Sequence, residues 1–233
     1  MSLPLIFKLP YTFDMYELTQ IQTLAVWAIP VLFAITLHEV AHGWVASKFG
    51  DQTARLAGRL TINPVKHIDP VGTILVPAAM LLLHTGFIFG WAKPVPVDAR
   101  NLRNPARDMA IVAAAGPVSN LLMAIFWAGI AKIGYMLLPN DSWFSIPLIY
   151  MGQAGIMINI VLGVLNCLPI PPLDGARVMY NLLPGKMGLF FYRLEPYGFL
   201  ILLLLMFSKI LYIILDPFVL FFTRSLTILF RLG

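Results

Sequence analysis

A long uncharged segment that runs directly into two histidines and a glutamate limits what this chain can fold into. Residues 19–37 contain no ionisable side chain, and His38, Glu39 and His42 follow at once. In a helix, side chains four positions apart lie on one face, so His38 and His42 can point at the same place. Glu39 lies roughly 100° around the helix axis from His38, close enough to reach a water molecule held there.

The His-Glu-x-x-His spacing supplies two imidazole ligands for zinc and a carboxylate for proton transfer. In soluble proteins the same spacing also occurs on surface helices that bind nothing. Here three ionisable groups adjoin apolar sequence of membrane length, where each costs a few kcal/mol unless it has a partner. Their position therefore favours a zinc site.

Composition places the rest of the chain in a membrane. Of its 233 residues, 59% are hydrophobic and 12% are charged, whereas soluble domains carry about 25% charged residues. We therefore predict an all-α polytopic membrane protein with about five to six transmembrane helices, forming one integral-membrane domain over residues 1–233. The net charge of +5 arises in short loops, where basic residues report orientation, so nucleic acid is not an expected partner. The single cysteine, Cys167, excludes an internal disulfide.

The apolar runs predict membrane spans over residues 18–48, 109–131 and 145–168. After residue 196 the sequence fits either one long span with an amphipathic end or two short spans. Residues 70–92 are uncharged but have basic loops on both flanks, and positive loops prefer one side of a membrane. We therefore expect residues 70–97 to form a re-entrant helix/strand element that lines the site, because non-helical backbone at membrane depth needs protein or water around it. A full crossing is the alternative.

A catalytic zinc site uses three protein ligands and a water, so a third ligand is required. Asp174 is the strongest candidate, because it follows a proline-rich stretch that cannot be helical and an acid at membrane depth needs a partner. The alternative is that Asp174 only caps the helix that restarts there. Glu195 is a further candidate, and most of the others fit structural roles as caps, in ion pairs, in loops or at interfaces: Asp69, Asp98, Asp108, His67 and His84.

Several stretches, in their order and spacing, resemble the site-2 protease family of zinc metalloproteases that cut within membranes. They are His38-Glu39-x-x-His42, Asn63-Pro64, Ile68-Asp69-Pro70-x-Gly72, Gly90-Trp91-Ala92-Lys93-Pro94-Val95-Pro96-Val97, Gly116-Pro117-x-x-Asn120 and Asn166-x-Leu168-Pro169-x-Pro171-Pro172-Leu173-Asp174-Gly175. The chain is most similar to the compact bacterial branch without PDZ or CBS domains. That family often has a second glycine where this chain has Ala176.

The resemblance implies that His38, His42 and Asp174 bind one catalytic Zn²⁺ ion, that Glu39 is the general base and that Asn166 holds substrate or the developing oxyanion. It implies hydrolysis of peptide bonds within or next to transmembrane segments. The expected partners are a transmembrane protein or peptide substrate and the lipid bilayer, and the expected location is a bacterial cytoplasmic membrane. The alternatives are a metal-binding membrane transporter, which would more naturally have repeated halves, and an inactive scaffold relative, which would not need Glu39.

Overall fold

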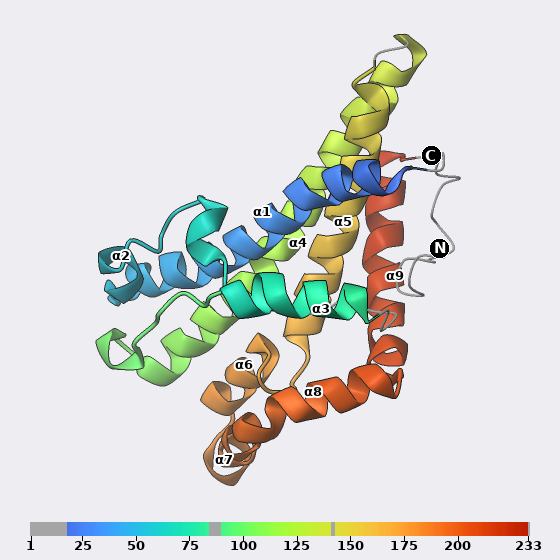
Figure 1. The fold of residues 1–233 in the computed structure, drawn as a ribbon. Coiled ribbons are helices and arrows are strands. Elements are labelled where there is room, and N and C mark those ends of the chain that lie inside the picture. Colours follow the sequence, from blue (N-terminus) through green and yellow to red (C-terminus); the bar gives the residue numbers. More distant parts are fainter. Residues whose placement is uncertain (1–17, 84–89, 141–142, 233) are drawn as a thin grey trace.

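Helices make up nearly all the regular structure of the chain, as a computed structural model shows for residues 18–83, 90–140 and 143–232 (Figure 1). In these described ranges there is no strand, and five helices are long and apolar enough to cross a membrane. They are Ile21–Lys48, Pro105–Asn140, Ser145–Cys167, Gly185–Phe207 and Ile210–Phe230. The predicted all-α, multi-pass membrane class is confirmed.

Helix α1 (Gln20–Lys48) carries the His-Glu-x-x-His sequence. It begins with a capping box, in which the Thr19 hydroxyl and the Gln22 side chain each accept the other residue's backbone N–H. Pro30 lies inside the helix, and helical structure continues on both sides of it. The short helix α2 (Thr53–Leu56) follows beyond the end of α1.

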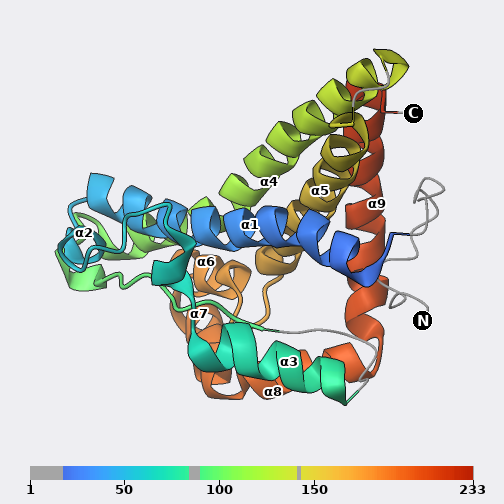
Figure 2. The same cartoon turned by 45° about the horizontal axis from the view of Figure 1, so that its top comes forward.

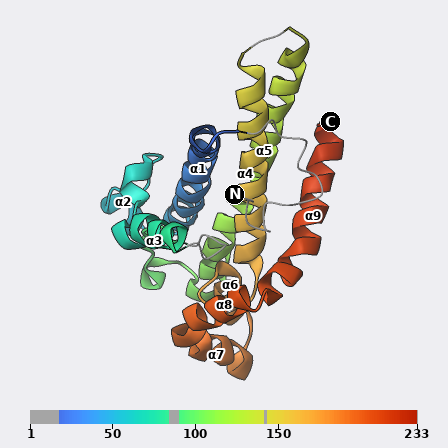
Figure 3. The same cartoon turned by 45° about the vertical axis from the view of Figure 1, so that its right-hand side comes forward.

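A hairpin of α4 (Pro105–Leu137) and α5 (Ser145–Cys167) forms the centre of the molecule, with α1 on one side and α9 (Ile210–Phe230) on the other (Figure 3). Glycines let its two helices approach closely, since a Cβ on Gly155 would lie 2.1 Å from the Trp127 ring. Helix α4 also packs on α1, as its small residues predict. It extends beyond the predicted 109–131 because Pro105 starts the helix ahead of the apolar run.

The chain after α5 forms a series of shorter helices. Helix α6 (Asp174–Leu182) begins directly after the proline-rich stretch. Helices α7 (Gly185–Leu194) and α8 (Gly198–Phe207) follow, and the 3-10 turn Glu195–Tyr197 joins them into the candidate span Gly185–Phe207. A break at Lys209, which adopts the left-handed conformation, separates α8 from α9. The tail therefore contains two candidate spans, and the first begins at Gly185, ahead of the predicted start at residue 196.

The element predicted at residues 70–97 begins as a helix, a π-helical turn η3 (Pro70–Leu75) followed by α3 (Val76–Leu82), which overlaps α8 in the projection of Figure 2. Asp69 caps it by accepting the Val71 and Gly72 N–H groups, as predicted. The returning residues 90–98 are non-helical but are not assigned as a strand. Re-entry into a bilayer stays a prediction, and His84 lies outside the described residues.

The buried carboxylate of Asp51 fixes the position of this returning segment. Its two oxygens accept hydrogen bonds from the Thr53 N–H and hydroxyl, the Asn101 amide at 3.0 Å and the Asp98 N–H at 2.8 Å. Burial disfavours the charged form of Asp51, but these hydrogen bonds outweigh burial and lower its pKa. Asp51 thus ties the end of α1 to the loop that leads into α4.

Replacing Asp51 by alanine should destabilise the protein by about 1–3 kcal/mol, because buried donors lose their acceptor. Thermal unfolding in detergent measures this. The stabilisation depends on ionised Asp51, whose pKa is lower in the folded state. It is therefore complete above the ordinary pKa of a carboxyl, near 4, and is lost as the pH falls through the folded-state value. The Asp98→Ala variant is the control, since its side chain pairs with exposed Arg100. Equal stability of both variants would contradict this role.

Candidate metal centre

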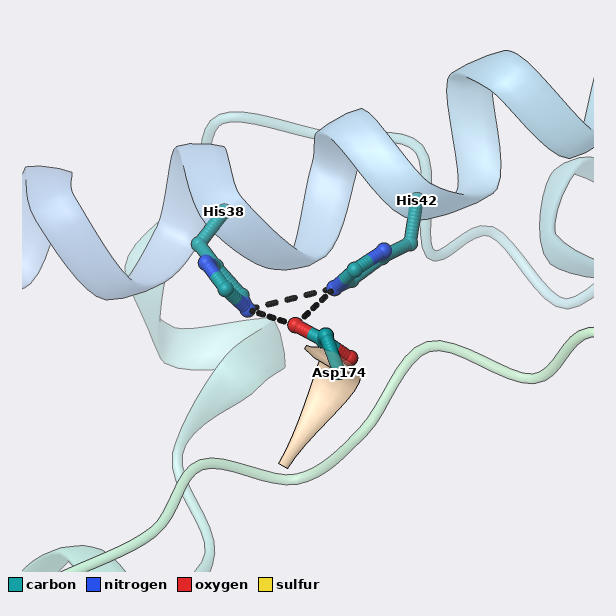
Figure 4. A group of neighbouring side chains, drawn as sticks. All are labelled: His38, His42 and Asp174. Carbon is teal, nitrogen blue, oxygen red and sulfur yellow. Dashed lines mark hydrogen bonds and ion pairs between the residues drawn. The ribbon is translucent and has the colours of Figure 1, made fainter. Parts of the chain in front are cut away.

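Helix α1 and the first residue of α6 bring three possible metal ligands together (Figure 4). The Nε2 atoms of His38 and His42 lie 3.1 Å apart. Asp174 Oδ2 lies 3.1 Å from His38 Nε2 and 3.3 Å from His42 Nε2. The spacing of i and i+4 residues on α1 produces the histidine pair, and the carboxylate returns to it after 131 intervening residues.

The other nitrogen of each imidazole determines which atom faces the site. His42 Nδ1 lies 2.7 Å from the Val112 carbonyl oxygen, which can only accept, so Nδ1 donates a proton. His38 Nδ1 likewise donates to Asn120 Oδ1 at 2.6 Å. In the neutral rings each Nε2 therefore presents a lone pair towards Asp174. Nothing in the sequence indicates that the Val112 carbonyl accepts from His42, because this contact depends on how α4 packs against α1.

These three atoms fit a bound cation. All three are acceptors with lone pairs, so at these distances they repel one another unless positive charge lies between them. Among the described residues, buried Asp174 Oδ2 has no hydrogen-bond partner. Ligands about 2.0–2.1 Å from a tetrahedral zinc are about 3.3 Å apart, which matches the separations here. A proton on one imidazole would satisfy one of the three contacts, whereas a central cation satisfies all of them.

Close backbone packing between the end of α5 and the start of α6 places Asp174 beside the two histidines. Helix α5 ends at Cys167, and the prolines that follow prevent its continuation. A Cβ on Gly175 would lie 2.4 Å from the carbonyl oxygens of Cys167 and Leu168. The start of α6 can therefore lie directly against the end of α5 only with glycine at position 175. The Asp-Gly pair is therefore a local requirement of this turn.

Gly116 of α4 packs on the two imidazoles. A Cβ there would lie 2.4 Å from His42 Nε2 and 2.6 Å from His38 Cε1. Gly116→Ala should therefore displace the rings and weaken zinc binding by about tenfold or more, as loss of outer-shell support typically does. Zinc affinity of the purified protein checks this. Gly129→Ala on the same helix, where a Cβ meets nothing within 4 Å, should bind as wild type, and equal affinity of both variants would contradict the packing argument.

Glu39 and Asn166 have other partners in this structure. Glu39 Oε2 accepts the Val95 N–H at 2.8 Å, which joins it to the returning segment. Asn166 lies on the last turn of α5, where its Nδ2 donates to the Leu162 carbonyl oxygen at 3.0 Å. Neither residue belongs to the group of three ligand atoms. The base and oxyanion roles implied for them stay predictions.

The remaining candidate residues lie in structural contacts. Asp98 pairs with Arg100 at 2.6 Å as expected, and the hydrogen bonds from Arg100 lower the pKa of Asp98 to about 2. His67 is buried and its Nε2 donates to the Thr61 carbonyl oxygen. The expectation that Asp108 is solvated or paired with an arginine is wrong. Asp108 is buried and accepts the Asn104 N–H at 2.8 Å, because it lies in the first turn of α4.

Comparison with known proteins gives relatives along most of the chain. It is 40% identical over 185 residues to the "Putative zinc metalloprotease YwhC" of Bacillus subtilis, covering 76% of this chain and 78% of that protein. It is 29% identical over 181 residues to the "Putative zinc metalloprotease Rip2" of Mycolicibacterium smegmatis, covering 77% and 66%. The Rip2 of Mycobacterium tuberculosis is 27% identical over 156 residues, covering 62% and 52%. No family model and no solved structure matches the chain.

Proposed function

This chain belongs to the zinc metalloprotease family of Bacillus subtilis YwhC, and we propose that it is an intramembrane endopeptidase of the site-2 protease type. Its substrates are transmembrane proteins or peptides, cut within or next to their spans, in a bacterial cytoplasmic membrane. One observation carries the proposal. Two imidazoles of an apolar helix and a distant carboxylate, which the sequence predicts as ligands, lie at zinc-ligand spacing.

His38, His42 and Asp174 would hold the zinc ion, and three protein ligands with a water is the set that catalytic zinc sites use. A zinc ion bound there would lower the pKa of its water towards about 7 and polarise the scissile carbonyl. Glu39 takes the proton of the attacking water and returns it to the leaving amine. In the present structure the Val95 N–H holds the Glu39 carboxylate, which restricts its rotamers beside His38. Asn166 is the proposed donor to the developing oxyanion, a role for which its Nδ2 must leave the Leu162 carbonyl.

The returning segment supports a docking role for unwound substrate. Its alternate residues Trp91, Lys93 and Val95 direct their N–H groups inward, to Gly72, His67 and Glu39. In extended chain the alternating residues Ala92, Pro94 and Pro96 face the opposite edge, and the two prolines have no N–H. That edge offers carbonyl acceptors at the prolines, although the Pro94 carbonyl also accepts a hydrogen bond from the Arg59 guanidinium at 3.4 Å. We expect it to pair with substrate N–H groups and to leave substrate carbonyls available to the metal centre.

A reconstituted assay tests the proposal. Purified protein in liposomes is given a single-span substrate, and fragment masses locate the cleaved bond. We expect cleavage in or beside the span, its loss on treatment with a zinc chelator and its return when zinc is added back. Zinc flux into the liposomes without any cleavage would support the transporter alternative instead. Zinc-independent cleavage would also contradict the proposal.

A further inference from the structure

Four hydrogen bonds link His38 to the interior of the helical bundle. His38 Nδ1 donates to Asn120 Oδ1 at 2.6 Å. The amide nitrogen of Asn120 donates to the Ala34 carbonyl at 3.1 Å and to Asn159 Oδ1 at 2.9 Å. The amide nitrogen of Asn159 donates to the Gly155 carbonyl at 2.9 Å. The relay thus joins α1, α4 and α5, and both asparagines have 0% exposure.

The two backbone carbonyls at the ends of this relay fix its direction. Those of Ala34 and Gly155 can only accept, so the amide nitrogen of each asparagine must face its carbonyl. Asn120 Oδ1 is then directed at His38, whose Nδ1 must carry the proton. The ring is held in the tautomer that leaves the Nε2 lone pair facing His42 and Asp174.

Helix packing alone does not account for two buried amides in this position. The same two helices, α4 and α5, contribute Ala124, Trp127 and Ile160 to a buried apolar core. Replacing both partners of a buried hydrogen bond by apolar groups of the same shape can be neutral or stabilising. The buried amide pair therefore points to a requirement at its other end, which is His38.

We propose that Asn120 and Asn159 are positioning residues that fix the tautomer and ring orientation of His38 for the metal. This inference rests on the proposed function, because it assigns the relay to the zinc centre described above. His42 obtains the same support from a backbone carbonyl, that of Val112, which substitution cannot remove. Of the two histidines, only His38 is oriented by side chains that can be substituted. Variants of these side chains can therefore isolate the contribution of His38 orientation to zinc binding.

The test measures zinc affinity by competition with a coloured chelator, the visible spectrum of the Co²⁺-substituted protein, and thermal stability. We expect Asn120→Leu to bind zinc about 10–100-fold more weakly and to change the Co²⁺ spectrum, without a matching loss of stability. Asn120→Asp keeps an acceptor for His38 Nδ1 but faces the Ala34 carbonyl with a carboxylate. It should retain zinc affinity near the wild-type value while losing stability.

Asn159→Leu probes the relay away from the histidine, and we expect a smaller loss of zinc affinity than for Asn120→Leu. The matched control is Gln153→Met. Gln153 also bonds from α5 to α4, donating to the Tyr135 hydroxyl at 3.2 Å, but it has no link to His38. It should bind zinc and Co²⁺ as wild type.

Two results would overturn the inference: wild-type zinc affinity in Asn120→Leu, or losses of affinity in all three asparagine variants that simply follow their losses of stability. If Asn120→Leu does not fold, the comparison of Asn120→Asp with Asn159→Leu decides, since only the latter should lose affinity. Absence of zinc binding by the wild-type protein would instead overturn the proposed function, and this inference with it.

Discussion

Replacing Glu39 by glutamine should lower cleavage of a transmembrane substrate by about 10²–10⁴-fold, the usual contribution of general acid–base catalysis. The substitution keeps the length of the side chain, and the amide oxygen can still accept the Val95 N–H that Glu39 Oε2 accepts at 2.8 Å. The amide cannot take up a proton at neutral pH. We therefore expect normal folding and normal zinc content with loss of turnover, measured on the reconstituted protein.

Zinc content makes the result for Glu39 interpretable. A variant that loses both metal and activity would only show that the site had been disturbed. A variant with a full complement of zinc that cleaves at the wild-type rate would remove Glu39 from its proposed role. Such a result would also contradict the view that an intact Glu39 separates this chain from an inactive relative.

Replacing Asp174 by alanine should remove the metal. The carboxylate supplies one of three ligand atoms within 3.1–3.3 Å of each other, so zinc affinity should fall by more than the 10–100-fold that follows loss of an outer-shell partner. Cleavage should fall to background at the same time. Metal analysis of the purified protein and the liposome assay together measure both effects.

Two further variants separate the ligand role of Asp174 from a capping role. Asp174→Ser keeps a side chain that caps helices well but supplies no carboxylate, and it should lose zinc as the alanine variant does. Arg177→Gln removes the ion pair of Asp174 Oδ1 at 3.9 Å and should keep zinc. Normal zinc binding by Asp174→Ser would support the capping alternative and contradict the ligand assignment.

The sequence allowed the local geometry of this centre to be predicted, but not the surroundings that hold it. The i, i+4 spacing of His38 and His42 depends only on helix geometry, and the prolines before Asp174 determine where α6 can begin. The partners of the two imidazoles depend on how α4 is rotated against α1. In a membrane protein the lipid-facing and the buried faces are both apolar, so hydrophobic periodicity does not reveal that rotation.

Polar residues within apolar spans were the available signal that sequence reasoning did not use. Asn120 was named from the sequence only as part of a family motif and Asn159 was given no role, although polar side chains at membrane depth are functional candidates by default. The error over Asp108 has a similar origin. Its arginine neighbour in sequence suggested an ion pair, whereas its buried position in the first turn of α4 gives it a backbone donor.

X-ray absorption at the zinc edge tests the central claim most directly, because it reports the ligands of the ion itself. The wild-type protein should contain one zinc per chain with two imidazoles and oxygen ligands at about 2.0–2.2 Å, and no sulfur at about 2.3 Å. Asp174→Ala should lose zinc or one oxygen ligand. Protein without zinc, a sulfur ligand from Cys167, or an unchanged spectrum in Asp174→Ala would contradict a centre built from His38, His42 and Asp174.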